Sequence, residues 1–191
     1  MVFQSYLLNY FSWSRRNHAV TLIMGERASD EDLSAIQTQL GRAPRDVHSI
    51  AYRCPCSHPA VVETNPRLSD GTPFPTFYYA TCPNLTAFIS TLENSPLMEE
   101  MNERLAIDAE LSGQYRAAHD DYLAARAALG IDVPEIVDIS AGGMPDRVKC
   151  LHSLIAHSLA AGEGVNPLGD EALALLPKWW LNGNCLERRD Q

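Results

Sequence analysis

The sequence has no excess of basic residues, and this absence limits the partners that it can bind. Its 15 lysines and arginines are outnumbered by 24 aspartates and glutamates, which gives a formal net charge of −9. Nucleic acids and anionic membranes present phosphate groups, and binding them calls for a basic surface. The composition therefore predicts no nucleic-acid partner and no membrane partner, but it leaves room for a local basic pocket that holds a small anionic ligand.

The chain also lacks several patterns that would assign it to a known class of domain. Its 191 residues contain no internal repeat, no low-complexity run and no interdomain linker. There is no phosphate-binding loop of the P-loop type, and there are no paired Cys-x-x-Cys knuckles. The cysteines are five in number and irregularly spaced, which argues against a secreted disulfide framework and favours reduced thiols in a cytoplasmic protein.

Residues 1–23 form a separate extension with a short aromatic and apolar run. No positive residue precedes this run, Arg15 and Arg16 follow it, and it is too short and too polar to span a bilayer. Three interpretations stay open. The extension is untranslated, because the true start is Met24; it is translated but disordered or loosely docked; or, as the least favoured choice, it is a membrane anchor.

Residues 24–191 are predicted to form a single α+β domain, in which several helices cover a small, mainly antiparallel sheet. Ser29 and Asp32 form a capping box ahead of a helix that ends at Gly41. We expect strands at 46–53, 60–64 and 76–81, and the aromatic third strand should be the strongest. Further helices are expected at 83–92, 96–105, 108–129 and about 170–176, with a strand or an extended connection at 133–139.

The stretch from Ser140 to His157 leads from a glycine-rich turn, through Pro145, into a helix that carries Cys150, His152 and His157. A helix turns by about 100° per residue, which puts Cys150 and His157 on one face and His152 at the edge of the aliphatic face. Two turns separate Cys150 from His157. A metal ion would therefore take one of them together with ligands from another segment.

A cysteine-rich turn offers such ligands. Cys54, Cys56 and His58 lie within five residues, and Cys82 is a further candidate. Together with Cys150 or His157 they predict a site for zinc or, with more cysteines, for an iron–sulfur cluster. The alternative is that the cysteines serve as small buried apolar side chains. Cys82, at the start of a helix, is also a candidate nucleophilic or redox thiol.

The glycine turn predicts a second kind of site. Ser140, Gly142 and Gly143 precede the expected helix N-terminus, and Arg147 and Lys149 add positive charge. Free amides, the helix dipole and two cations would together bind a phosphate or a carboxylate. A plain tight turn is the competing interpretation. Other polar side chains are candidates for lining a pocket: Arg67, Asp70, His119, His152 and Asn166.

Six stretches of the chain have a distinctive amino-acid sequence: Arg53–Cys56, Pro59–Val62, Pro66–Thr76, Thr81–Pro83, Ser140–His152 and Asn166–Asp170. Together they resemble an uncharacterised bacterial family, known mainly as a domain of unknown function in actinobacteria, over about residues 29–185. Ser57 departs from the glycine that the resemblance leads us to expect there. Genes of this family often lie near those for a septum-formation initiator, enolase and an exopolyphosphatase, but the resemblance implies no established activity.

Three hypotheses for function follow. The first is a cytoplasmic protein with a Cys/His-lined metal or small-ligand site. The second is an enzyme or binding protein for a phosphorylated or otherwise anionic small molecule, which the loop at Gly142 and Gly143 would hold. The third is a non-catalytic partner in cell division or envelope regulation.

Overall fold

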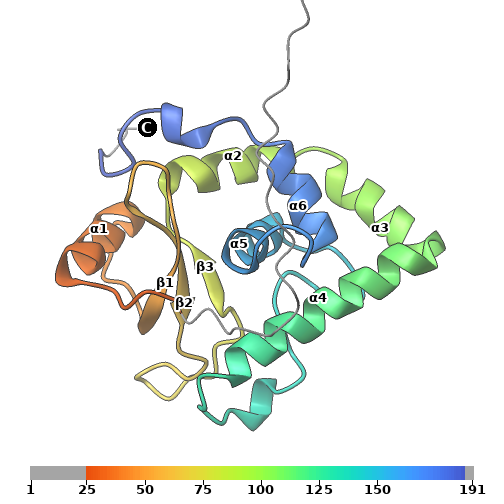
Figure 1. The fold of residues 1–191 in the computed structure, drawn as a ribbon, viewed down its shortest axis with the longest axis horizontal. Helices are drawn as coiled ribbons and strands as arrows, with labels where there is room; N and C mark the ends of the chain where they lie inside the picture. Colours follow the sequence, from red (N-terminus) through yellow and green to blue (C-terminus); the bar gives the residue numbers. More distant parts are fainter. Residues whose placement is uncertain (1–24, 188–191) are drawn as a thin grey trace, which may run out of the picture.

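The computed structural model describes residues 25–187, so the interpretations of residues 1–23 concern a segment outside the described part. Helices and a small antiparallel sheet make up this part, which confirms the predicted α+β class (Figure 1). In chain order the elements are α1 (Asp30–Leu40), β1 (Val47–Arg53), β2 (Pro59–Thr64), β3 (Tyr78–Ala80), α2 (Pro83–Glu93), α3 (Leu97–Ile107), α4 (Ala109–Ala127), η1 (Pro134–Ile136), α5 (Leu151–Ala161), α6 (Pro167–Ala174) and η2 (Trp179–Leu181).

The three strands pair in the order β1-β2-β3, and both pairs are antiparallel. The prediction that 76–81 is the strongest strand was wrong, because β3 covers only Tyr78–Ala80. At Phe77 the pairing with β2 is incomplete: its carbonyl accepts the Thr64 amide at 2.9 Å, but its own amide donates to the Tyr122 hydroxyl oxygen of α4 at 2.6 Å. Residues 133–139 contain the short helical turn η1 and no strand.

Neighbouring residues of β2 face opposite sides of the sheet, as strand geometry requires. Val62 packs with Ile36 of α1 and Ile50 of β1 in a small cluster on one face. Val61 belongs to the larger core on the other face, which the remaining helices cover. Figure 1 shows α1 on one side of the sheet and α5 on the other. The fold therefore has three layers, with the sheet in the middle.

Helix α5 lies at the centre of the helical side, where it contacts β3, α2 and α6 (Figure 1). We expected this helix to follow from Pro145, but it begins at Leu151, and residues 140–149 form turns and extended backbone. Gly169 of α6 rests against the backbone of Leu154 and the Ser158 hydroxyl, where a larger residue would collide. No helix in the described part of the chain has the length and apolar character needed to cross a membrane.

The capping box predicted for α1 is present and is tied to the sheet. Ser29 and Asp32 exchange hydrogen bonds between side chains and backbone amides. The Arg53 guanidinium of β1 donates two hydrogen bonds to the Asp32 carboxylate, at 2.7 and 2.9 Å. These bonds from Arg53, helped by those from Ser29, hold the pKa of Asp32 well below its usual range despite its burial.

Replacing Asp32 with Asn is expected to lower the free energy of unfolding at pH 7 by about 1–3 kcal/mol, since a charge-assisted pair is lost. A carboxyl whose folded pKa is depressed contributes stability above its unfolded pKa, near 4, and loses it as the pH falls toward the folded pKa. Urea denaturation at several pH values from 7 to about 3 should therefore show that the free energies of unfolding of the wild-type and Asp32→Asn proteins become more similar as the pH falls. A difference that stays constant with pH would contradict this account.

Candidate functional site

The turn between β1 and β2 holds three of the predicted metal ligands close together. The Cys54 amide donates to the His58 carbonyl at 2.9 Å, and the Ser57 amide donates to the Cys54 carbonyl at 2.7 Å. Ser57 has a positive φ of 73°, which is the reason a glycine suits this position. The closed turn projects Cys54, Cys56 and His58 from a short length of backbone.

Cys185, near the end of the described chain, completes this group. Its sulfur lies 3.6 Å from the Cys56 sulfur and 3.5 Å from Nδ1 of His58. The ligand atoms of Cys56, His58 and Cys185 all lie within 4.8 Å of one another. We call these three residues, together with Cys54, the thiol cluster. Cys54 is included because it comes from the same turn and its pKa responds to Cys56, although its sulfur does not lie within 4.8 Å of all three other ligand atoms.

The thiols differ in their acidity. Burial raises the pKa of Cys54 to about 11 and that of Cys185 to about 12. Burial also acts on Cys56, but hydrogen bonds from the His58 amide and from neighbouring thiols outweigh it and lower the pKa. Cys82 is wholly buried next to the cluster, and its burial raises its pKa. That shift is opposite to the one that the hypothesis of a nucleophilic Cys82 requires.

Two buried polar atoms border the thiol cluster without an aligned hydrogen-bond partner in the part of the chain described. One is the indole N–H of Trp179, which lies beside the Cys54 sulfur. The other is Oε1 of Gln39, whose Nε2 donates to the Cys185 sulfur at 3.5 Å and to the Pro59 carbonyl at 2.9 Å. Buried polar groups almost always have a hydrogen-bond partner, so two without one beside the same thiols need a specific explanation, such as a bound ion.

The structure does not bring the other predicted ligands, Cys150 and His157, into this cluster. His157 is wholly buried, stacked on Tyr78 with ring centroids 5.5 Å apart. Its Nε2 lies 3.0 Å from the Asp121 carboxylate, and its Nδ1 lies 3.3 Å from Nδ2 of Asn166. Both ring nitrogens are thus engaged within the protein, and His157 has a structural role.

Cys150 instead forms a second group with His152 and Glu93. The placement of Cys150 and His152 on different helical faces was wrong, because Cys150 is the N-cap of α5 and its backbone is extended (φ −154°). Helical phase therefore does not apply to it, and its side chain turns toward His152. The ligand atoms of Cys150, His152 and Glu93 all lie within 4.8 Å of one another. We call these three residues the α5 triad.

The α5 triad is held together by hydrogen bonds and charge. Nδ1 of His152 lies 3.2 Å from Oε1 of Glu93, and the same oxygen accepts the Leu151 amide at 2.7 Å. Burial raises the pKa of Cys150, but the hydrogen bonds from His152 and Ser153 outweigh it, so the pKa is lowered. The hydrogen bond with Cys150, aided by Glu93, raises the pKa of His152 to about 9.

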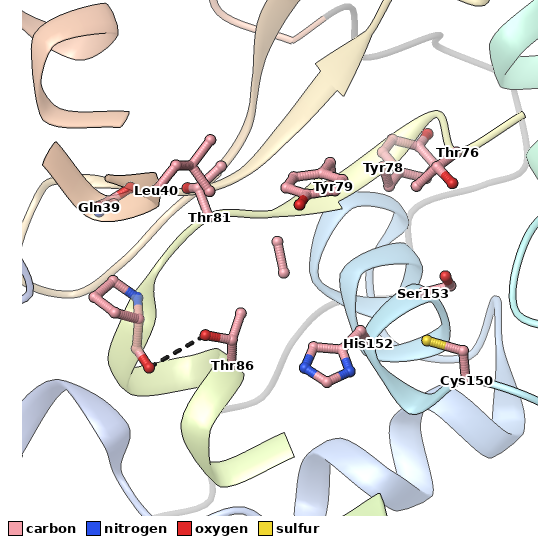
Figure 2. Close-up of a pocket in the computed structure, with 12 residues that line it drawn as sticks. Gln39, Leu40, Thr76, Tyr78, Tyr79, Thr81, Thr86, Cys150, His152 and Ser153 are labelled. Atoms are coloured by element: carbon pink, nitrogen blue, oxygen red, sulfur yellow. Dashed lines mark hydrogen bonds between the residues drawn. The ribbon is translucent and has the colours of Figure 1, made fainter. Parts of the chain in front are cut away.

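A cavity of about 500 Å³ opens beside this triad, between α1, β3, α2 and the start of α5. Cys150 and His152 form part of its wall, and Figure 2 shows them on the α5 side, with the strand that carries Tyr79 and Thr81 opposite. Thr86 of α2 completes the side next to His152. Cavities of this size typically hold small molecules.

The family model described as "Protein of unknown function (DUF501)" matches residues 50–174. The chain belongs to this family. The searches of curated proteins and of solved structures gave no match. The family match contains the turn at Cys54–His58 and the whole α5 triad, but it ends before Cys185.

The glycine loop of this DUF501 chain does not present the free helix amides on which the predicted anion site depends. The amide of Lys149 donates to the Gly142 carbonyl at 2.7 Å, and that of Arg147 donates to the Gly143 carbonyl at 3.1 Å. The amides of the first turn of α5 donate to Glu93. The loop therefore has the hydrogen bonding of a closed turn, although the Arg147 and Lys149 residues are exposed.

Two of the predicted pocket residues hold surface loops in place. The guanidinium of Arg67 forms an ion pair with Glu135 at 2.7 Å. Asp70 accepts the Thr72 amide at 2.9 Å, and this bond lowers its pKa. These contacts stabilise the loop between β2 and β3 and leave neither side chain in the 500 Å³ cavity.

Two more predicted pocket residues are buried and hold structure together. His119 lies with Nδ1 at 2.8 Å from the Ser140 hydroxyl, which links α4 to the glycine loop and accounts for Ser140 as well. Asn166 caps α6 by accepting the Gly169 amide at 3.0 Å, so α6 begins at Pro167, earlier than the predicted Asp170. Of the five pocket candidates, only His152 lines the cavity.

Two residues of these groups, Cys185 and Glu93, were not predicted as site residues. Cys185 is 129 residues from Cys56, and its only signal was that it is a fifth thiol near the paired tryptophans. Glu93 ends α2 and accepts an amide 58 residues further along the chain, a contact that no local pattern encodes. Both are long-range contacts that follow from the packing of elements.

The ring of His152 is expected to titrate near pH 9, well above the 6.5 of an unperturbed histidine. Because the folded pKa is raised, the linked stability is complete below about pH 6.5 and is lost as the pH rises through 9. Replacing Cys150 with Ser removes the largest cause and should bring the NMR titration midpoint of His152 down. The control variant Thr91→Ala, at an exposed position nearby on α2, should leave this midpoint unchanged. A midpoint near 6.5 in the wild-type protein would contradict the interactions of His152 with Cys150 and Glu93.

Proposed function

We propose that this protein binds one zinc ion through the thiol cluster and that the ion fastens the C-terminal segment to the β1–β2 turn. The observation that carries the proposal is the spacing of the ligand atoms. Tetrahedral zinc, with Zn–S bonds of about 2.3 Å and Zn–N bonds of about 2.0 Å, separates two sulfurs by about 3.8 Å and a sulfur from a nitrogen by about 3.5 Å. The measured separations are 3.6 Å between Cys56 and Cys185 and 3.5 Å between Cys185 and His58.

Cys54 is the best candidate for the fourth ligand. It projects from the same turn as Cys56 and His58 and lowers the pKa of Cys56, whereas the interaction of Cys82 with Cys54 and Cys56 is one of charge alone. The buried indole N–H of Trp179 beside Cys54 supports the same choice, because a zinc-bound thiolate is a better hydrogen-bond acceptor than a neutral thiol. Donors of this kind commonly orient the ligands of a metal site.

The same geometry favours zinc over the other interpretations of these cysteines. Three sulfurs and one imidazole nitrogen form a ligand set typical of structural zinc. The ligands of an iron–sulfur cluster bind several iron atoms, so their sulfurs must lie farther apart than those of Cys56 and Cys185 in the thiol cluster. None of the five cysteines, all in the described part of the chain, forms a disulfide, which is consistent with a reducing compartment, and we propose a cytoplasmic location on that basis.

The proposed ion would act on the fold. Cys185 follows α6 and η2, and Trp179 of η2 is buried against the core. A bond from Cys185 to an ion held by Cys56 and His58 would keep this segment docked on α2 and on the hairpin. Binding to the native chain alone stabilises it by about 4 kcal/mol when the free metal exceeds the dissociation constant a thousandfold.

Protein purified under reducing conditions without chelator is expected to contain about one equivalent of zinc by elemental analysis. Cys185→Ser should lose most of this zinc, and a strong chelator should lower the Tm of the wild-type protein by about 10 °C. Cys150→Ser is the matched control, because it removes a cysteine outside the cluster and should keep the full equivalent.

The fourth ligand can be tested separately with cobalt(II) in place of zinc. Cys54→Ser should weaken the thiolate-to-cobalt absorption, while Cys82→Ser should leave the spectrum unchanged. Zinc below about one tenth of an equivalent in folded, reduced wild-type protein would overturn the proposal. Equal zinc contents in the wild-type and Cys185→Ser proteins would overturn it as well.

A further inference from the structure

We propose that the α5 triad is a catalytic thiol centre that transfers acyl groups from uncharged carbonyl substrates held in the adjoining cavity. Cys150 would be the nucleophile, His152 the general acid and base, and Glu93 the positioning residue. This inference does not depend on the thiol cluster, because the two groups share no residue.

Cys150 has the placement that a nucleophile needs. It is the N-cap of α5, partly exposed, and it lines the cavity. Ser153 in the first turn of α5 lowers the pKa of its thiol, and the start of the helix adds a favourable dipole. These groups stabilise a thiolate, which is the reactive form of cysteine.

His152 and Glu93 supply the other two roles of a nucleophilic triad. The imidazole of His152 lies within 4.8 Å of the Cys150 sulfur and lines the cavity wall, so it can serve a leaving group as well as the sulfur. Its Nε2 lies 3.4 Å from the Ser90 hydroxyl in the absence of substrate. Oε1 of Glu93, 3.2 Å from Nδ1 of His152, fixes the ring. The side chains of His152 and Glu93 are only 29% and 23% exposed, which limits competition from water.

The cavity indicates the class of substrate. Among the described residues that line it, none is Lys, Arg, Asp or Glu. The wall opposite α5 carries neutral side chains, including Tyr79, Thr81 and Thr86. An uncharged ester, thioester or amide fits such a lining, because the one cation among the described residues of the wall, protonated His152, is already balanced by Glu93.

The reaction balances with water as the only co-reactant. The Cys150 thiolate attacks the carbonyl carbon and forms a C–S bond, and the bond to the leaving group breaks as that group takes the proton of His152. Neutral His152 then removes a proton from water, whose oxygen attacks the thioester carbon. The C–S bond breaks, the carboxylic acid leaves, and the thiolate and imidazolium are restored.

The test uses the full-length chain, purified under reducing conditions without chelator, and the neutral ester p-nitrophenyl acetate. We expect p-nitrophenolate release together with an acetyl group on Cys150, located by mass spectrometry after an acid quench. His152→Asn should lower the acylation rate by about 100-fold, and its rate should keep rising with pH where that of the wild-type protein is flat. An anionic p-nitrophenyl ester that has no internal nucleophile should acylate Cys150 more slowly than the acetate does.

The controls separate a catalytic role from a structural one. Thr91→Ala, at an exposed position on α2 outside the triad, should react like the wild-type protein. Glu93→Gln keeps an acceptor for the Leu151 amide and should lower the rate without unfolding the chain, as circular dichroism will show. Cys150→Ser should remain folded and carry no acetyl group.

Three results would overturn the proposal. One is a Cys150 that reacts no faster than a free cysteine derivative at pH 7, and another is acetylation that favours a different cysteine. The third is a second metal equivalent that disappears in Cys150→Ser, since the triad would then be a metal site. A chain that acetylates Cys150 and yet contains no zinc would overturn only the proposal for the thiol cluster.

Discussion

The start of α5, the central helix of the helical side, depends on the hydrogen bonds that its first amides donate to the Glu93 carboxylate. The first amides of a helix have no partner within it, and leaving them unpaired in a protein interior is costly. Cys150, at the N-cap, makes no side-chain bond to them. Glu93, from another helix, takes this role at 2.7 Å from the Leu151 amide. The bond joins α2 to α5 and at the same time places a negative charge beside His152.

The sequence was a good guide wherever a few adjacent residues decide the structure. Ser29, Asp32 and Gly41 delimit α1 as predicted, since caps depend on residues within one turn. The start of α5 was not predictable in this way, because the acceptor of its amides lies on α2. Because Cys150 precedes the first residue of α5, the rotation of 100° per helical residue could not predict where its side chain lies relative to that of His152. The turn at Cys54–His58 was recognised, but its completion by Cys185 needed the packing of distant segments.

The five cysteines show how strongly surroundings decide the chemistry of one residue type. Cys82 is wholly buried, and its thiol is less acidic than usual. Cys54 and Cys185 lie among other sulfurs, where burial also disfavours an isolated thiolate. Cys150 alone sits between an imidazole and a helix start at the wall of a cavity. A count of cysteines could not separate these environments.

The separation of Cys56 from Cys185 also bears on how the chain reaches its final form. The two residues are 129 positions apart, so the turn at Cys54–His58 is made long before its last member is synthesised. Contacts between residues so distant along the chain form late, because the intervening chain must first be ordered. Until then Cys56 and His58 stand at the end of a hairpin with no partner from the C-terminal segment. The contact of Cys185 with Cys56 can therefore form only after nearly all of the described chain has been synthesised.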